Sequence, residues 1–186
     1  LTEPLACCVH SISKARIKFG DTVVIIGMGI MGYFHLKLAL MQGARVIVSE
    51  MDETRKQKAL ESGAHVVIDP GKQDLAEEVR KLTNGLGADV VVNTIPSLSV
   101  WNSAIDTLAP YGRLIAYSSQ DSKEPVGVDF GKVHSREIEF IGTLNPTIED
   151  NERAVRLITY GMIDMEEVID ARFPFEQGKE AFEAAL

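Results

Sequence analysis

A glycine-rich turn near the start of this chain lies between a strand pattern and a helix pattern, and it leaves few folds open. The apolar segment TVVII is followed at once by Gly27, Gly29 and Gly32 in the spacing G-x-G-x-x-G, and then by the helical segment YFHLKLALMQ. Glycine permits a tight turn, a close approach of a ligand to the backbone, and close packing of a helix on a strand. Such a turn at the start of a helix predicts a binding site for the diphosphate of a dinucleotide. A turn with only a packing role is the alternative.

Short apolar runs rich in Val and Ile alternate with segments of helical periodicity along the whole chain. The runs are continuously apolar, as expected for strands that are covered on both faces. They lie at residues 22–26, 45–49, 65–68, 89–92, 113–117 and 137–141. The helical segments lie at residues 4–17, 30–42, 53–62, 75–83, 98–108, 150–161 and 177–186. This order predicts one α/β domain over residues 1–186, a Rossmann fold with a doubly wound, six-stranded parallel sheet flanked by helices.

Charge and cysteine content narrow the range of partners and compartments. The 186 residues include 19 basic and 27 acidic side chains, for a formal net charge of −8, which disfavours a nucleic-acid partner. No apolar run reaches the roughly 20 residues of a membrane helix, and the opening shows no signal-peptide pattern. The only cysteines are the neighbours Cys7 and Cys8, which are poorly placed to pair. We therefore expect a reduced, cytoplasmic setting without membrane contact.

Glu50 is the candidate residue for selecting the cofactor. It follows the second apolar run, 18 residues after Gly32, near the spacing of about 20 at which an acid binds the ribose hydroxyls of an adenosine. Two unit charges 4 Å apart near a protein surface interact by about 4 kcal/mol, so a carboxylate opposes the 2′-phosphate of NADP. Half of that energy disfavours NADP by more than about tenfold, which predicts NAD. Arg55 opposes this prediction if it accepts a phosphate; contact with the ribose or adenine edge, or simple solvation, are its other interpretations.

Several longer segments resemble the cofactor domain of zinc-type medium-chain dehydrogenases that act on alcohols and polyols, the sorbitol dehydrogenases among them. These segments are "EPLACCVHSISKARIKFGDTVVIIGMGIMG", "GARVIVSE", "ESGAHVVID", "LTNGLGADVVVNTIPS", "PYGRLIAYSS" and "ITYGMIDMEEVIDARFPFEQGKEAFEAAL". The resemblance covers nearly the whole chain. It implies hydride transfer between NAD and an alcohol, polyol or sugar in a longer homodimeric or homotetrameric protein. It also implies that a GroES-like catalytic domain, which binds zinc, is absent from this chain, so that the fragment alone is inactive and contains no catalytic residue.

The resemblance also assigns residues to the cofactor. The glycine loop would contact the diphosphate, the end of the second strand the adenosine ribose, and the ends of the fourth and fifth strands the nicotinamide ribose and carboxamide. In that order the residues are Gly27, Gly29, Ile30, Met31 and Gly32; Glu50 and Arg55; Thr94 and Ile95; and Tyr117, Ser118 and Ser119. For Thr94 and Tyr117 a plain strand end is the alternative. The family often has glycine at Ser118 and an acid at Asn93, so the resemblance does not fix the detailed geometry of the nicotinamide site, although it still implies the cofactor.

Glu3 is the one candidate metal ligand. In polyol dehydrogenase relatives a glutamate in the context "EPL" binds zinc or the water on it, which implies a zinc role for Glu3 together with the missing domain. The alternative is an acid that stabilises the start of a helix. The histidines show no metal-ligand spacing, and His35 is interpreted as a packing residue.

Two other functions stay open on the sequence. One is a zinc-free NAD(P)H-dependent enone or quinone reductase of the same superfamily. The other is a module that senses NAD without catalysis.

Overall fold

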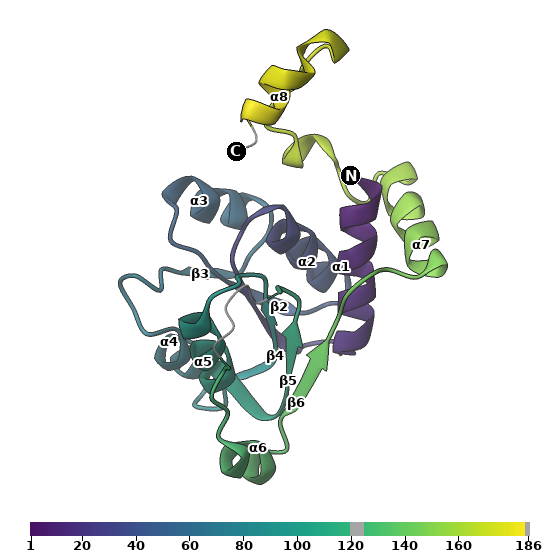
Figure 1. The fold of residues 1–186 in the computed structure, drawn as a ribbon. Coiled ribbons are helices and arrows are strands. Elements are labelled where there is room, and N and C mark those ends of the chain that lie inside the picture. Colours follow the sequence, from purple (N-terminus) through teal and green to yellow (C-terminus); the bar gives the residue numbers. More distant parts are fainter. Residues whose placement is uncertain (120–124, 185–186) are drawn as a thin grey trace.

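The computed structural model describes residues 1–119 and 125–184, which form a six-stranded parallel sheet with helices on both faces (Figure 1). The strand order β3-β2-β1-β4-β5-β6 is that of a doubly wound Rossmann domain, so the predicted fold class is confirmed. The strands are β1 (Thr22–Ile26), β2 (Arg45–Ser49), β3 (Val66–Ile68), β4 (Ala88–Asn93), β5 (Leu108–Ala116) and β6 (Glu139–Gly142).

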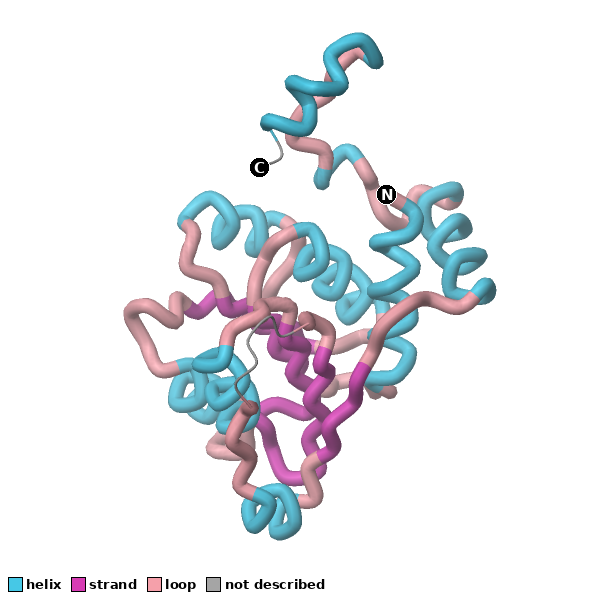
Figure 2. The backbone as a smooth tube through the Cα atoms, viewed as in Figure 1, coloured by secondary structure: helices cyan, strands magenta, loops and turns pink. Residues whose placement is uncertain are grey.

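The helices form two layers, one on each face of the sheet (Figure 2). The first layer packs on Val23 and Ile25 of β1, and the second packs on Val24 and Ile26, so every residue of this strand is covered. That arrangement explains why the strand is continuously apolar. The first layer contains α1 (Thr2–Ala15), α2 (Ile30–Met41), α3 (Glu53–Glu61) and α7 (Ile148–Thr159). The second contains α4 (Leu75–Leu82), α5 (Leu98–Thr107) and α6 (Phe130–Arg136).

Side-chain caps fix where several helices begin. Asp52 accepts a hydrogen bond from the backbone N–H of Arg55 at the start of α3, and Asp74 does the same for α4. Thr147 and Asp150 form a reciprocal capping box at the start of α7. These caps satisfy N–H groups that have no partner inside the helix, which is why the predicted helix starts lie close to the observed ones.

The structure differs from the predictions in the fifth and sixth strands. The fifth strand begins at Leu108, five residues earlier than predicted, and within it the register with β4 shifts and Tyr111 adopts a left-handed φ of 62°. The sixth strand begins at Glu139, two residues later than predicted, because Glu137 ends α6 with a φ of 50°. The helix α6 itself was not predicted, since none of its seven residues is buried and it has no apolar stripe.

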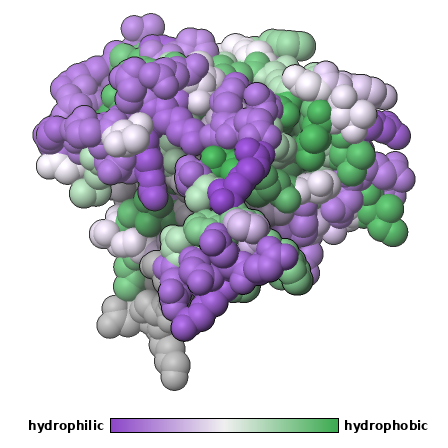
Figure 3. All heavy atoms as spheres, turned by 90° about the horizontal axis from the view of Figure 1, so that it is seen from above, coloured by the Kyte–Doolittle hydropathy of each residue, from purple (hydrophilic) through white to green (hydrophobic). Residues whose placement is uncertain are grey.

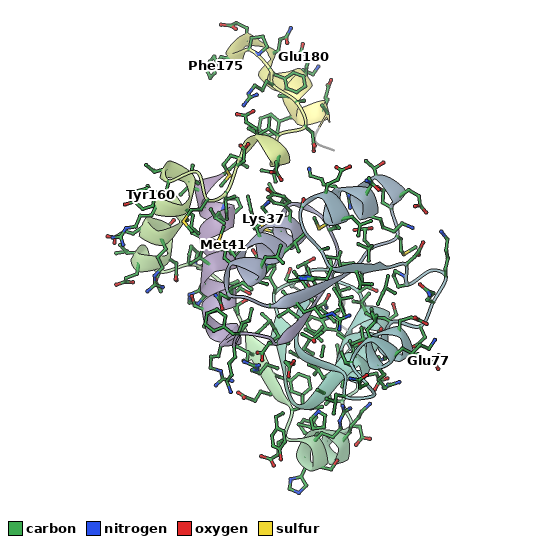
Figure 4. All side chains as sticks on the ribbon, turned by 180° about the vertical axis from the view of Figure 1, so that it is seen from behind. Lys37, Met41, Glu77, Tyr160, Phe175 and Glu180 are labelled. Carbon is green, nitrogen blue, oxygen red and sulfur yellow. The ribbon has the colours of Figure 1, made fainter. Side chains whose placement is uncertain are left out.

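The last part of the chain projects away from the sheet (Figures 1 and 4). The projecting part contains the 3-10 turn η2 (Phe175–Gln177) and the helix α8 (Gly178–Ala184). The 3-10 turn before it, η1 (Glu166–Val168), packs on the domain: Val168 contacts the core, and the Tyr33 hydroxyl donates to Glu167 Oε2 at 2.6 Å. The predicted helix at residues 177–186 therefore matches α8, and its last two residues lie outside the described part. Phe175 is 97% exposed on this projection.

The surface seen from above is mostly hydrophilic, with apolar side chains gathered on one side (Figure 3). In residues 1–119 and 125–184, none of the helices combines the length and the apolar character needed to cross a membrane.

Candidate dinucleotide-binding site

The glycine loop connects β1 to α2 in a conformation that two of its glycines require. Gly27 has a φ of +94°, which side chains rarely adopt, and its N–H donates to the carbonyl of Ser49 at 2.8 Å. A Cβ on Gly32 would lie 2.0 Å from the carbonyl oxygen of Gly27, a backbone atom that cannot move aside cheaply. Gly32 therefore lets α2 start directly against the turn.

Gly29 has a different environment, which points to a ligand. A Cβ built on Gly29 meets no atom within 4 Å, so the protein itself does not require a glycine here. Gly29 is also the N-cap of α2 and makes no side-chain cap. Within the described part of the chain, no acceptor faces the N–H groups of Ile30, Met31 and Gly32. Open space beside unpaired amides at the positive end of a helix fits a diphosphate.

The carboxylate of Glu50 lies against the same loop. Its Oε2 atom accepts a hydrogen bond from Met28 N at 2.8 Å, and its Oε1 atom accepts from Met51 N at 2.7 Å and Asp52 N at 3.0 Å. Glu50 thus links the loop after β1 to the turn after β2. Oε2 has a single donor among the described residues, so a lone pair remains for a ribose hydroxyl.

A pocket of about 260 Å³ lies between the loop and α3 and brings Arg55 beside Gly29 and Ile30. Lys58 lines the same pocket, and the sequence analysis missed it. The spacing in the sequence could have identified Lys58, because a residue three positions after Arg55 lies on the same face of a helix. The lining residues are Met28, Gly29, Ile30, Tyr33, Asp52, Thr54, Arg55, Lys58, Val168 and Asp170.

A second pocket, of about 240 Å³, lies beside Glu50 and is mainly apolar. Met51 and Ile95 line it together with Glu50, so Ile95 lies near the end of β2. Its lining residues are Ile26, Ser49, Glu50, Met51, Pro70, Leu75, Ile95, Val100 and Ser103. The apolar walls fit a flat heterocycle such as adenine.

The remaining predicted residues lie at the carboxyl ends of β4 and β5. The Thr94 hydroxyl donates to the carbonyl of Ile26 at 2.7 Å, and the Tyr117 hydroxyl donates to Met31 Sδ at 3.2 Å, so both side chains are engaged inside the protein. Ser118 has a buried hydroxyl without a partner among the described residues, and Ser119 is exposed. Of these four residues, only Ser119 presents its side chain openly at this edge.

Glu3 lies exposed in the first turn of α1, where the Cys7 thiol donates to its Oε1 atom at 3.1 Å. Burial and the neighbouring Glu3 raise the pKa of Cys7 to about 11, so this cysteine stays protonated at neutral pH. Across residues 1–119 and 125–184, no three His, Cys, Asp or Glu side chains come together as a metal site. The described residues therefore do not fit a zinc ion by themselves.

Fold and loop together define a Rossmann domain with an open glycine loop at the start of α2. A family model described as zinc-binding dehydrogenase matches residues 27–160. D-arabitol-phosphate dehydrogenase from Enterococcus avium is 32% identical over 100% of this chain and 53% of its own length. Sorbitol dehydrogenase from Halalkalibacterium halodurans is 30% identical over 99% of this chain and 54% of its own length. The chain belongs to the zinc-binding dehydrogenase family, which confirms the resemblance.

A solved structure gives the same fold. A protein from Sinorhizobium meliloti 1021, described as a zinc-binding dehydrogenase bound to NADP, superposes with a TM-score of 0.91 at 27% identity. It covers 97% of this chain and 53% of its own. The chain thus spans about half the length of the relatives it matches.

Proposed function

We propose that this chain is the NAD-binding domain of a zinc-type alcohol or polyol dehydrogenase whose other half supplies the zinc site and most substrate contacts. The observation that carries the proposal is the open space at Gly29 beside unpaired amides, with the Glu50 carboxylate next to it. Bound NAD supplies the acceptor for a hydride from the substrate. Relatives with polyol and polyol-phosphate names support the substrate class.

Each part of the dinucleotide has a proposed partner. The N–H groups of Ile30, Met31 and Gly32 donate to the diphosphate, and Glu50 accepts a hydrogen bond from the adenosine ribose. The apolar pocket lined by Ile95 holds the adenine ring. The nicotinamide half lies along the carboxyl ends of β4 and β5. There the backbone beside Thr94 and at Tyr117, Ser118 and Ser119 is placed to orient it.

Glu50 supports NAD over NADP, whereas two basic side chains support the opposite choice. Arg55 and Lys58 line the pocket beside the loop and can attract a 2′-phosphate. The Sinorhizobium relative with NADP bound adds weight to this second candidate, which fits an NAD(P)H-dependent reductase. We favour NAD because the Glu50 carboxylate is fixed by three backbone N–H groups and cannot turn away from a phosphate without losing them.

A titration of the chain with NADH and with NADPH tests this choice. We expect NADH to bind about tenfold tighter or more, because the 2′-phosphate meets the fixed carboxylate. Glu50→Gln is expected to reduce the ratio of the NADPH to the NADH dissociation constant. Lys58→Ala, the matched change in the neighbouring pocket, is expected to weaken the binding of NADPH and leave that of NADH unchanged. The measurement is the dissociation constant from nicotinamide fluorescence. Tighter binding of NADPH by the unaltered chain would overturn the choice of NAD.

The proposed activity belongs to the full-length protein. We expect it to oxidise a polyol with NAD and to lose about a hundredfold or more of its turnover after zinc is removed by chelation, because zinc lowers the pKa of the reacting alcohol. Added zinc should restore turnover. Zinc-independent reduction of an enone with NADPH would establish the reductase instead, and NADH binding without any turnover would indicate a sensing module.

We also propose that the full-length protein is a homodimer or homotetramer in the cytoplasm. The resemblance implies association through the edge of the sixth strand, and apolar side chains are exposed at that edge and just after it. They are Phe140, Leu144 and Ile148. Both cysteines of the described chain are free thiols, which supports a reducing compartment.

A further inference from the structure

Two chains of hydrogen bonds begin on α1 and meet at Met31, inside the glycine loop. Met31 lies between Gly29 and Gly32, and its backbone N–H is one of the donors at the start of α2 that have no acceptor in residues 1–119 and 125–184. Side chains of α1 thus support the glycine loop through His35 and Tyr117, although α1 contributes no residue to the proposed cofactor contacts. Apart from Met31, the residues in these chains lie outside the glycine motif, and among them the proposed function gives a direct cofactor contact only to the backbone at Tyr117.

The first chain runs from Ser11 through His35. His35 is fully buried, with Nδ1 2.7 Å from the carbonyl oxygen of Met31 and Nε2 2.9 Å from Ser11 Oγ. A carbonyl can only accept, so Nδ1 carries the proton and donates it, while Nε2 accepts from the serine hydroxyl. Burial lowers the pKa of His35 to about 4, which keeps this arrangement neutral at physiological pH.

The second chain runs from Cys8 through Tyr117. The Cys8 thiol lies 3.7 Å from the Tyr117 hydroxyl, which donates to Met31 Sδ at 3.2 Å. Burial raises the pKa of Cys8 to about 12, so it remains a thiol donor. The rings of Tyr117 and His35 pack edge to face with centroids 4.6 Å apart, so the two chains also support each other.

We propose that His35 and Tyr117 are positioning residues for the diphosphate, because they hold both the carbonyl and the thioether of Met31. This inference rests on the proposed dinucleotide site. Methionine has three rotatable side-chain bonds, and an unanchored Met31 would sample many conformers beside the loop. Fixing it before the ligand arrives reduces the ordering cost of binding. The benefit falls on ligands that contain the diphosphate, since only those use the amide of Met31.

The test compares two ligands that differ in the diphosphate. ADP-ribose contains it and adenosine lacks it. In the chain with Tyr117→Phe or Ser11→Ala, each of which removes one hydroxyl, we expect the dissociation constant of ADP-ribose to rise about threefold to tenfold. The constant for adenosine should change by less than about twofold. Ser13→Ala is the matched control on α1, because the Ser13 hydroxyl donates to the carbonyl of Val9 at 2.8 Å and has no other partner among the described residues.

A second measurement tests the mobility of the glycine loop in the absence of any ligand. Hydrogen exchange of the Tyr33 amide, which donates to the carbonyl oxygen of Gly29 at 2.9 Å in the cofactor-free chain, should be faster in Tyr117→Phe and Ser11→Ala than in Ser13→Ala. His35→Phe removes both hydrogen bonds of the ring and should give the largest change; the two milder variants test the proposal even if that one does not fold.

Each outcome has one meaning. If the unaltered chain does not bind ADP-ribose, the proposed function itself fails. If it binds and the variants lose less than about twofold, or lose equally for ADP-ribose and adenosine, the network is only structural and the positioning role is overturned.

Discussion

Gly29→Ala is expected to leave the fold intact and to weaken NADH binding by about tenfold or more. The added methyl group meets no protein atom, and the backbone at Gly29 has a φ of −70° that alanine adopts freely. The methyl group instead occupies the space beside the unpaired amides, where the diphosphate is proposed to lie. Fluorescence titration with NADH and thermal unfolding, measured on the same samples, give the two required readouts.

Gly32→Ala is the comparison that makes this result specific. Its added Cβ would lie 2.0 Å from a backbone oxygen, so the loop or the helix must shift, and we expect a destabilisation of about 3 kcal/mol or more. NADH affinity and stability should therefore both fall in Gly32→Ala, whereas in Gly29→Ala the affinity should fall and the stability should stay unchanged. NADH affinity within about twofold of the unaltered chain in Gly29→Ala would place the diphosphate elsewhere.

Arg113→Met is expected to lower the free energy of unfolding by about 3–5 kcal/mol. Arg113 lies on β5, is only 8% exposed, and donates to the carbonyl oxygens of Ala15 and Arg16 at 2.6 Å each. It also pairs with Asp21 at 2.8 Å. Since it satisfies the end of α1 and a largely buried carboxylate together, its removal leaves several polar groups without partners.

Urea unfolding at neutral pH measures this effect, and Arg16→Met provides the matched control. Arg16 also pairs with an acid, Glu139, but both side chains are about half exposed. Exposed pairs contribute about 0–1 kcal/mol, so the control should unfold nearly as the unaltered chain does. Similar losses of unfolding free energy in both variants would show that the buried contacts of Arg113 at the end of α1 stabilise the fold no more than an exposed ion pair does.

The sequence predicts the parts of this fold that depend on local signals. The helix after the glycine loop, predicted at residues 30–42, is observed as Ile30–Met41, because a glycine N-cap and a Gln-Gly end mark it. The early start of β5 and its register shift against β4 were not predicted, because register is a contact between distant segments. Short elements without a buried face, such as α6, carry no periodic signal.

The candidate site likewise has features that local sequence motifs predict and features that depend on contacts between distant residues. The glycine spacing and the position of Glu50 identify the residues, because a motif of fixed length places them at one edge of the sheet. The partners of Glu50 and the support of Met31 depend on folding: Ser11 is 24 residues from His35, and Cys8 is 109 residues from Tyr117. No local pattern reports such pairs, so His35 could be predicted only as a packing residue.

The turn at Gly27 is held by contacts with two segments that lie at very different distances along the sequence. The carbonyl of Ser49 on β2 lies on one side, and on the other Thr94 bonds to Ile26 across 68 residues of sequence. Contacts between distant segments are slow to form, so a chain that has folded only its first strand–helix–strand unit has no finished ligand pocket. Dinucleotide binding therefore reports that folding is complete, and the ligand stabilises the finished domain rather than its intermediates.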